Sequence, residues 1–155
     1  MEIIGAVSFA ASIVSLVDFC CKVVKGSYEI YRSESDAPLE HAQIGTVLDD
    51  LDGVAKTLQA KVELDIAHSE PLLKLASDCL AASTELSDIL KDIRRKEGNR
   101  VWRSLEAKWT SMRKEGALAA VEQRLNFLRL EFLLRLNLVI RYAQLKLEAH
   151  VNSPE

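Results

Sequence analysis

Histidine, cysteine and serine are the side chains that most often carry out chemistry in proteins, and here none of them forms a catalytic or metal-binding group. His41, His68 and His150 lie in separate segments, and none has a second ligand at metal-binding spacing. The six glycines are scattered singly, so there is no phosphate-binding loop, and no serine stands in a nucleophile elbow. We therefore predict a protein that is not an enzyme and that holds no metal and no cofactor.

The cysteines also lack a chemical partner in the sequence. Cys20, Cys21 and Cys79 are odd in number, and the adjacent pair has the spacing of neither a disulfide framework nor a metal knuckle. We expect each of them to be a small buried apolar residue in a reducing compartment. Palmitoylation of the adjacent pair is the alternative.

The composition predicts a single all-α domain. Of the 155 residues, 48% are hydrophobic and 28% charged, and a chain of this length can bury a core without disulfides or metals. Its 6 glycines and 3 prolines are too few for the many turns of sandwiches and barrels. We expect one helical bundle over residues 1–151, with 152–155 as a linker or chain end.

Apolar periodicity and helix-end signals divide this domain into four long helices and one shorter helix. Pro38 is suited to a helix start, Gly98 to a left-handed C-cap and Asn99 to the N-cap of the short helix. The short helix carries Trp102 and Trp109 on one face, which indicates core packing. The expected helices are 3–32, 38–66, 69–97, 99–115 and 117–150.

The first helix is the most unusual segment of the chain. Residues 3–17 are fifteen positions without a charge. The acidic N-terminus and the lack of a small-residue cleavage site argue against a signal peptide. A transmembrane span needs about 20 apolar residues, so the run is short unless Asp18 and Lys22 are tolerated.

Polar residues of this helix recur at steps of three and four, which places them on one narrow stripe. Two interpretations stay open. The helix is wetted along this line and buried on its other faces, as in the innermost helix of a resting bundle, or the stripe lines a membrane pore in another state. The stripe consists of Ser8, Ser12, Ser15, Asp18, Lys22, Lys25 and Glu29.

Charge is divided unevenly along the chain. Residues 1–90 hold 15 Asp/Glu and 6 Lys/Arg, whereas residues 91–155 hold 8 and 14, which gives net charges of −9 and +6 within the total of −3. One account is the packing of an acidic helix pair on a basic one. The other is a basic face for anionic lipid or for an acidic partner.

The basic residues concentrate in 91–114, where nine Lys/Arg stand against three acids. Nucleic acid is disfavoured as a partner, because the whole chain is acidic and the two tryptophans have the spacing of core residues. Basic residues beside an apolar insertion segment fit anionic lipid better. A solvated face that meets the acidic helices is the alternative.

Four stretches of the chain resemble the N-terminal domains of fungal STAND and NLR-type receptors, the HeLo-like group, and through them the HeLo and mixed-lineage-kinase-like four-helix domains. They are packing motifs and include no catalytic signature. The resemblance rests on the apolar first helix ending in Val17-Asp18-Phe19, on Ser27-Tyr28-Glu29-Ile30-Tyr31-Arg32-Ser33, on Leu72-Leu73-Lys74-Leu75-Ala76 leading to Cys79 and Glu85-Leu86, and on Arg100-Val101-Trp102-Arg103-Ser104 followed by Val121-Glu122-Gln123-Arg124-Leu125.

This resemblance implies a helical bundle at the N-terminus of an immune receptor. Such a domain is normally followed by a nucleotide-binding oligomerisation module and ligand-sensing repeats, which we expect to be missing from this chain. In these families, receptor oligomerisation brings the effector domains together. The first helix is then thought to leave the bundle and enter the membrane, which kills the cell.

The leading hypothesis is a cell-death effector domain of a fungal NLR-like immune receptor, cytoplasmic at rest and membrane-associated when activated. Its expected partners are further copies of itself and anionic lipids. The competing hypothesis is a non-toxic adaptor bundle that binds another helical protein and keeps its first helix as permanent core. The effector hypothesis assigns membrane insertion to Ile3, Ile4, Val7, Phe9, Ile13, Val14 and Leu16, the polar pore lining to Ser8, Ser12, Ser15 and Asp18, and headgroup docking to Arg94, Arg95, Lys96, Arg100 and Arg103.

Overall fold

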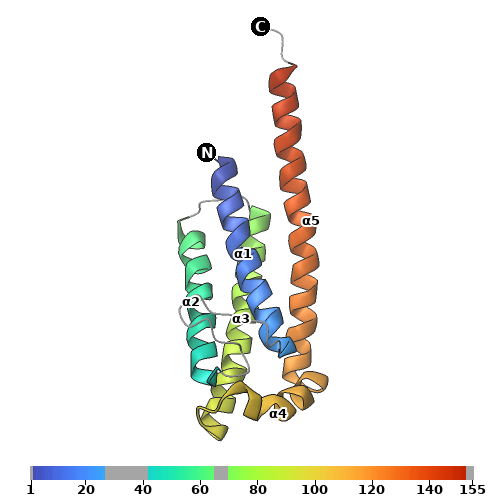
Figure 1. Cartoon of the computed structure of the whole chain (residues 1–155). Coiled ribbons are helices and arrows are strands. Elements are labelled where there is room, and N and C mark those ends of the chain that lie inside the picture. The colour runs from blue at the N-terminus through green and yellow to red at the C-terminus, as the bar shows by residue number, and fades with distance from the viewer. Residues whose placement is uncertain (1, 27–41, 65–69, 153–155) are drawn as a thin grey trace.

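The predicted all-α architecture is confirmed by a computed structural model, which describes residues 2–26, 42–64 and 70–152. Within these ranges the chain forms helices and no β-strand. Figure 1 shows four helices running side by side, with the short one lying across one end of the bundle. The helices are α1 (Glu2–Lys25), α2 (Ile44–Glu63), α3 (Glu70–Glu97), α4 (Trp102–Lys114) and α5 (Ala117–Val151).

The predicted bounds of α3 and α5 agree with the structure to within one residue. The last turn of α3 holds three cations, which complement the helix dipole. Gly98 then takes a φ of +78°, and its amide donates to the carbonyl of Arg94 at 2.9 Å, as the left-handed C-cap requires. Gly116, with a φ of +79°, precedes the first residue of α5.

The prediction that the first helix extends to residue 32 is wrong. The helix ends at Lys25, because Gly26 takes a φ of +66° and its amide donates to the carbonyl of Val23 at 3.0 Å. The polar periodicity that continued to Glu29 concealed this stop. Residues 27–32 lie outside the described residues.

The second helix begins at Ile44 rather than at residue 38, because Gln43 is extended and forms an isolated antiparallel bridge with Val101. The amide of Ile44 donates to the carbonyl of Arg100 at 3.0 Å, and the amide of Trp102 donates to the carbonyl of Ala42 at 2.8 Å. The proposed start at Pro38 and the predicted end at residue 66 lie outside the described residues. In the structure, α2 ends at Glu63.

The predicted role of Asn99 as the cap of the short helix is also wrong. The α4 helix begins at Trp102 after Val101, which makes no side-chain cap hydrogen bond. Asn99 instead caps α2, since its Oδ1 accepts a hydrogen bond from the Gly45 amide at 2.7 Å. Its Nδ2 donates to Oε1 of Gln43 at 3.1 Å. The loop before α4 therefore fixes the start of a helix more than 50 residues away.

The hydrophobic core lies between α1, α2, α3 and the first half of α5. Both tryptophans belong to it, as predicted: Trp102 and Trp109 are buried and meet edge to face with ring centroids 4.7 Å apart. All three cysteines are buried and free, which confirms their predicted packing role. Burial raises the pKa of Cys79 to about 12 and also raises those of Cys20 and Cys21.

The second half of α5 projects beyond the bundle (Figure 1). Its core-facing seam is buried as far as Phe132 and only half-buried at Leu136. Ten of the fourteen exposed large hydrophobic side chains among the described residues belong to this one helix. They are Phe127, Leu130, Leu133, Leu134, Leu138, Ile140, Tyr142, Leu145, Leu147 and Val151.

Candidate functional site

The α1 helix is the one described helix that is long and apolar enough to cross a membrane, by length and composition. The qualifying stretch, Val7–Lys25, has 19 residues and would extend about 28 Å as a helix, close to the roughly 30 Å of a bilayer core. Just over half of this stretch is buried inside the bundle, and a core helix of a soluble protein passes the same test.

The residues expected to enter lipid do not share one face of α1. Phe9, Ile13 and Leu16 are completely buried against the other helices. Val7 and Val14 lie on the outer side, with 62% and 45% of their surface exposed. The side chains of Ile3 and Ile4 lie outside the described residues. Insertion of the whole set would therefore require α1 to leave the bundle.

The polar stripe is divided between the core and solvent. The prediction that the whole stripe is exposed to water in the resting bundle is therefore wrong at Ser12. This side chain is only 7% exposed, because Lys61 from α2 covers it. Ser15 is exposed and donates to the carbonyl of Ala11 at 2.9 Å. Asp18 is exposed and pairs with Lys22 at 3.1 Å, one turn further along the same helix.

Lys61 is the functional candidate that sequence reasoning missed. Its Nζ donates to Oγ of Ser12 at 2.6 Å, to Oγ of Ser8 at 2.9 Å and to the carbonyl of Ser8 at 3.2 Å. A signal was present, since Lys61 follows the core residue Leu58 by three positions and so lies on the inner face of α2. A lysine at such a position needs polar partners on the helix opposite.

The other end of α1 is held by Trp109. The indole Nε1 donates to the carbonyls of Val23 at 3.0 Å and Val24 at 2.9 Å in the last turn of α1, and the Val23 carbonyl also accepts from the Gly26 amide. Gly26 packs directly against this contact: a Cβ at this position would lie 3.5 Å from Trp109 and 3.6 Å from Nε1 of Trp102. The indole therefore acts as a C-terminal cap for α1.

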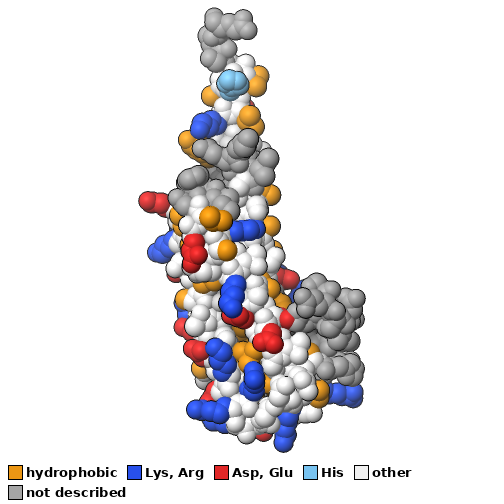
Figure 2. Space-filling view, turned by 90° about the vertical axis from the view of Figure 1, so that its left-hand side faces the viewer, with side chains coloured by type: hydrophobic (Ala, Val, Ile, Leu, Met, Phe, Trp, Pro, Cys, Tyr) orange, Lys and Arg blue, Asp and Glu red, His pale blue; other side chains and the backbone are white. Residues whose placement is uncertain are grey.

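The five residues assigned to headgroup docking lie together where α3 ends and α4 begins. Figure 2 shows Lys and Arg side chains gathered at this lower end of the molecule. Lys96 pairs with Asp92 at 3.1 Å, and Arg95 pairs with the same carboxylate. These hydrogen bonds, that of Lys96 above all, lower the pKa of Asp92. Arg94 and Arg103 take part in none of the ion pairs formed between described residues.

The basic end of the bundle is opposite the N-terminus of α1 (Figure 1). The C-terminal end of α1 lies at the basic end, because Trp109 of α4 holds Val23 and Val24 there. Charge pairing between the acidic and basic halves is sparse. Of the ion pairs between described residues, only that of Arg124 with Glu85 joins the two halves. Several cations of the basic end instead pair with acids of their own half, as Lys108 does with Glu97 and Arg113 with Glu122.

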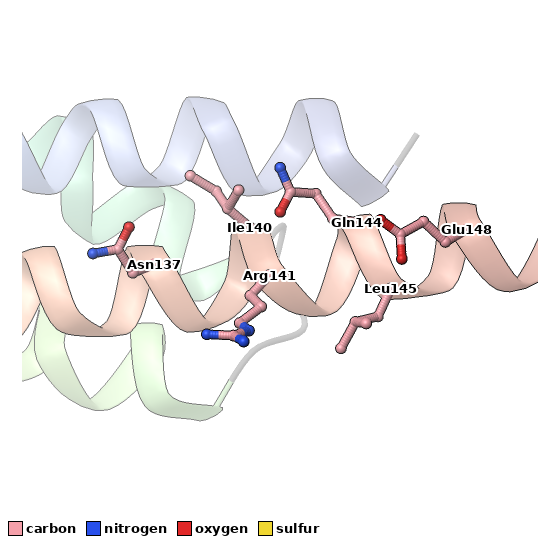
Figure 3. Close-up of a pocket in the computed structure, with 6 residues that line it drawn as sticks. All are labelled: Asn137, Ile140, Arg141, Gln144, Leu145 and Glu148. Atoms are coloured by element: carbon pink, nitrogen blue, oxygen red, sulfur yellow. The ribbon is translucent and has the colours of Figure 1, made fainter.

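A shallow pocket lies on the projecting part of α5. Figure 3 shows Ile140 and Gln144 directed toward α1, and Arg141 and Leu145 directed away from it. All the lining residues come from this one helix, so the pocket is a surface depression. Among the described residues no cluster of His, Cys, Asp or Glu could hold a metal ion.

Comparisons of the chain with protein-family models, with curated proteins and with solved structures found no match.

Proposed function

We propose that this chain is a membrane-permeabilising effector domain of the cell-death type, carried by a fungal NLR-like receptor, and that clustering releases α1 into the bilayer. The observation that carries the proposal is the position of α1. It is an N-terminal helix with the length and apolar composition of a membrane span, yet Phe9, Ile13 and Leu16 are completely buried at rest. The proposed fungal source and cell-death role rest on the family resemblance.

The arrangement of the two ends of α1 supports a swinging motion. The chain leaves α1 at Gly26, at the basic end of the bundle, while the N-terminus lies at the far end. If Arg94, Arg100 and Arg103 dock on anionic headgroups, the C-terminal end of α1 is already near the membrane. An α1 that pivots about Gly26 is an arm of about 36 Å, long enough to carry its N-terminus into the bilayer.

Release of α1 has a high cost, which explains why clustering is needed. Six of the α1 side chains that the structure describes have no exposed surface, and their burial contributes a large part of the core. A single copy would therefore keep α1 docked almost all the time. In a cluster, inserted helices can contact one another, and Ser15 and Asp18, already exposed at rest, supply a polar side to such contacts. The six residues are Phe9, Ile13, Leu16, Cys20, Val23 and Val24.

The test is dye release from anionic and from neutral liposomes, with the purified chain as a monomer and fused to an oligomerising scaffold. Val14→Glu is the informative variant, because Val14 is exposed at rest but lies inside the inserting segment. Ala60→Glu is its control, since it places the same charge on an exposed position of α2. We expect leakage that needs clustering and anionic lipid and that is lost only in the Val14 variant.

Two results would contradict the proposal: an absence of leakage at every degree of clustering, or equal leakage by the two glutamate variants. Circular dichroism must show that both variants keep the wild-type helix content. The buried Phe9 is unsuitable for this test, because a glutamate there would disturb the resting bundle as well as insertion.

A second candidate function, a protein-interaction adaptor, is favoured by the exposed face of α5. Phe127, Leu130, Leu134 and Leu138 follow one another at steps of three, four and four on the side away from the core. An apolar face of this extent is typical of a helical binding surface. For an adaptor, Leu130→Glu should abolish association while Val14→Glu leaves it unchanged, and no liposome should leak.

A further inference from the structure

One cation fastens the N-terminal half of α1 to α2. Lys61 lies in the last turn of α2, and its ammonium group has three N–H donors. All three have an acceptor on α1: the hydroxyl of Ser12, the hydroxyl of Ser8 and the carbonyl of Ser8. The site is partly buried, so water competes for these donors less than it would on an open surface.

The two attachments of α1 differ in strength. The hydrogen bonds from Trp109 to Val23 and Val24 are buried, and the indole is itself packed in the core. The hydrogen bonds from Lys61 are only partly buried and depend on a flexible side chain. Local opening of a helix begins where its contacts are weakest and most accessible. The polar attachment of the N-terminal half of α1 is therefore the weaker of the two.

We propose that Lys61 is a latch that controls release of α1, and that α1 opens from its N-terminal end while Trp109 holds its C-terminal end. The proposal deepens the proposed function and rests on it for its biological meaning. The latch sets the fraction of time that the N-terminal half of α1 is undocked. A ligand or a cluster that binds the undocked state can capture only this fraction.

The chemistry of the site suits a reversible contact. Leu58, one turn before Lys61 on the same face, is completely buried, so an apolar residue at position 61 could also pack against α1. Such a residue would avoid the desolvation cost of an ammonium group. A lysine opposite two serines gives instead a contact that water can replace. The cation is also favoured at the C-terminus of α2 by the helix dipole, which keeps it in place when α1 is undocked.

The experiment is hydrogen–deuterium exchange of the full chain, read by mass spectrometry over peptides of α1 and α3. Lys61→Met removes the ammonium group and keeps a side chain of similar length. Lys56→Met is the matched control, because Lys56 is on the same helix, pairs with Asp52 and is exposed. Ser12→Ala is a second variant that removes one acceptor and adds no bulk.

We expect amides of residues 8–16 to exchange roughly tenfold faster in Lys61→Met, which corresponds to the loss of about one charge-assisted hydrogen bond. Ser12→Ala should give a smaller increase at the same amides. Lys56→Met should exchange as the wild type does, and α3 should be unchanged in all variants. The latch is overturned if Lys61→Met and Lys56→Met exchange alike, or if α1 and α3 speed up together.

Dye release by the same variants separates this proposal from the function on which it rests. If Lys61→Met exposes α1 and also leaks dye at a lower degree of clustering than Lys56→Met, the latch and the membrane activity are both supported. Faster exchange in α1 without leakage under any condition supports the latch and contradicts the membrane activity. Equal exchange with equal leakage supports the membrane activity and contradicts the latch.

Discussion

The indole Nε1 of Trp109 donates a hydrogen bond to the carbonyl of Val23 across 86 residues of sequence. This contact places the middle of the short α4 helix under the last turn of α1. It gives this carbonyl a second donor beside the Gly26 amide, at the end of α1 where helical partners run out. The short helix acts as a support for the C-terminus of α1.

Replacing Trp109 with phenylalanine should therefore destabilise the bundle. The variant keeps an aromatic ring but removes the buried hydrogen bonds to the carbonyls of Val23 and Val24, of which the Val23 carbonyl still accepts from the Gly26 amide. We expect the free energy of unfolding in urea to fall by roughly 1 to 3 kcal/mol. Hydrogen exchange should increase at the C-terminal end of α1. An unchanged urea midpoint would show that water satisfies these carbonyls.

Asn99 should contribute to the stability of α2 and not of α4. Asn99→Ala removes the side-chain acceptor of the Gly45 amide, and loss of such a cap costs about 1 kcal/mol. Exchange should rise at the first turn of α2 and stay constant at the first turn of α4. The opposite pattern would restore the cap role that local sequence rules assign to Asn99. Asn126→Ala, at an exposed position on α5, is the control.

The three cysteines should be unreactive in the folded protein. Burial raises the pKa of Cys79 to about 12, far above the ordinary thiol value of about 8.5, and raises the pKa values of Cys20 and Cys21 as well. Ellman's reagent at pH 8 should detect no thiol in the native chain and three in urea. Rapid labelling of a native thiol would contradict the packing of α1 against α3.

The same raised pKa values predict how stability depends on pH. The folded chain holds its thiol protons more tightly than the unfolded chain does, so the contribution is complete below about pH 8.5. It is lost progressively as the pH rises from there toward the folded pKa of about 12 for Cys79. Urea titrations between pH 8 and 11 should show this decline. Cys79→Ala should show a shallower decline than the wild type.

Charge reversal at the basic end should weaken binding to anionic vesicles. The variant replaces Arg94, Arg100 and Arg103 with glutamate, all of which are exposed. Each basic residue near an anionic surface contributes about 1 kcal/mol, so binding in a sedimentation assay should fall at least tenfold. The matched control replaces three exposed cations of α5 with glutamate. If both variants lose vesicle binding equally, the basic end is not a specific docking site. The control positions are Arg129, Arg141 and Lys146.

Where helix ends are set locally, the sequence was a sufficient guide. The cations and Gly98 mark the end of α3, and Gly116 followed by a long run without Gly or Pro marks α5. The end of α1 could not be predicted in this way. The turn at Gly26 is completed by Trp109, from a helix that is distant in sequence. Asn99 likewise obeys a capping rule, but the rule does not say which helix it caps.

The candidate site was predictable in part for a similar reason. Spacing correctly placed Ser8 and Ser12 on one side of α1, because helical geometry fixes which residues share a face. Their partner on α2 depends on how two helices pack, which the pattern of a single helix does not contain. Val7 and Val14 differ from Phe9 for the same reason. Apolar character predicts burial in general, but neighbouring helices decide which residues are covered.

The isolated bridge between Gln43 and Val101 has a mechanical consequence. It joins the residue before α2 to the residue before α4. The segment that contains α2 and α3 is therefore connected at both of its ends. None of the bonds of this bridge involves α1. A force on the N-terminus of α1 would therefore peel that helix away one contact at a time, first at Lys61 and last at Trp109. The bridge would meanwhile keep the starts of α2 and α4 together.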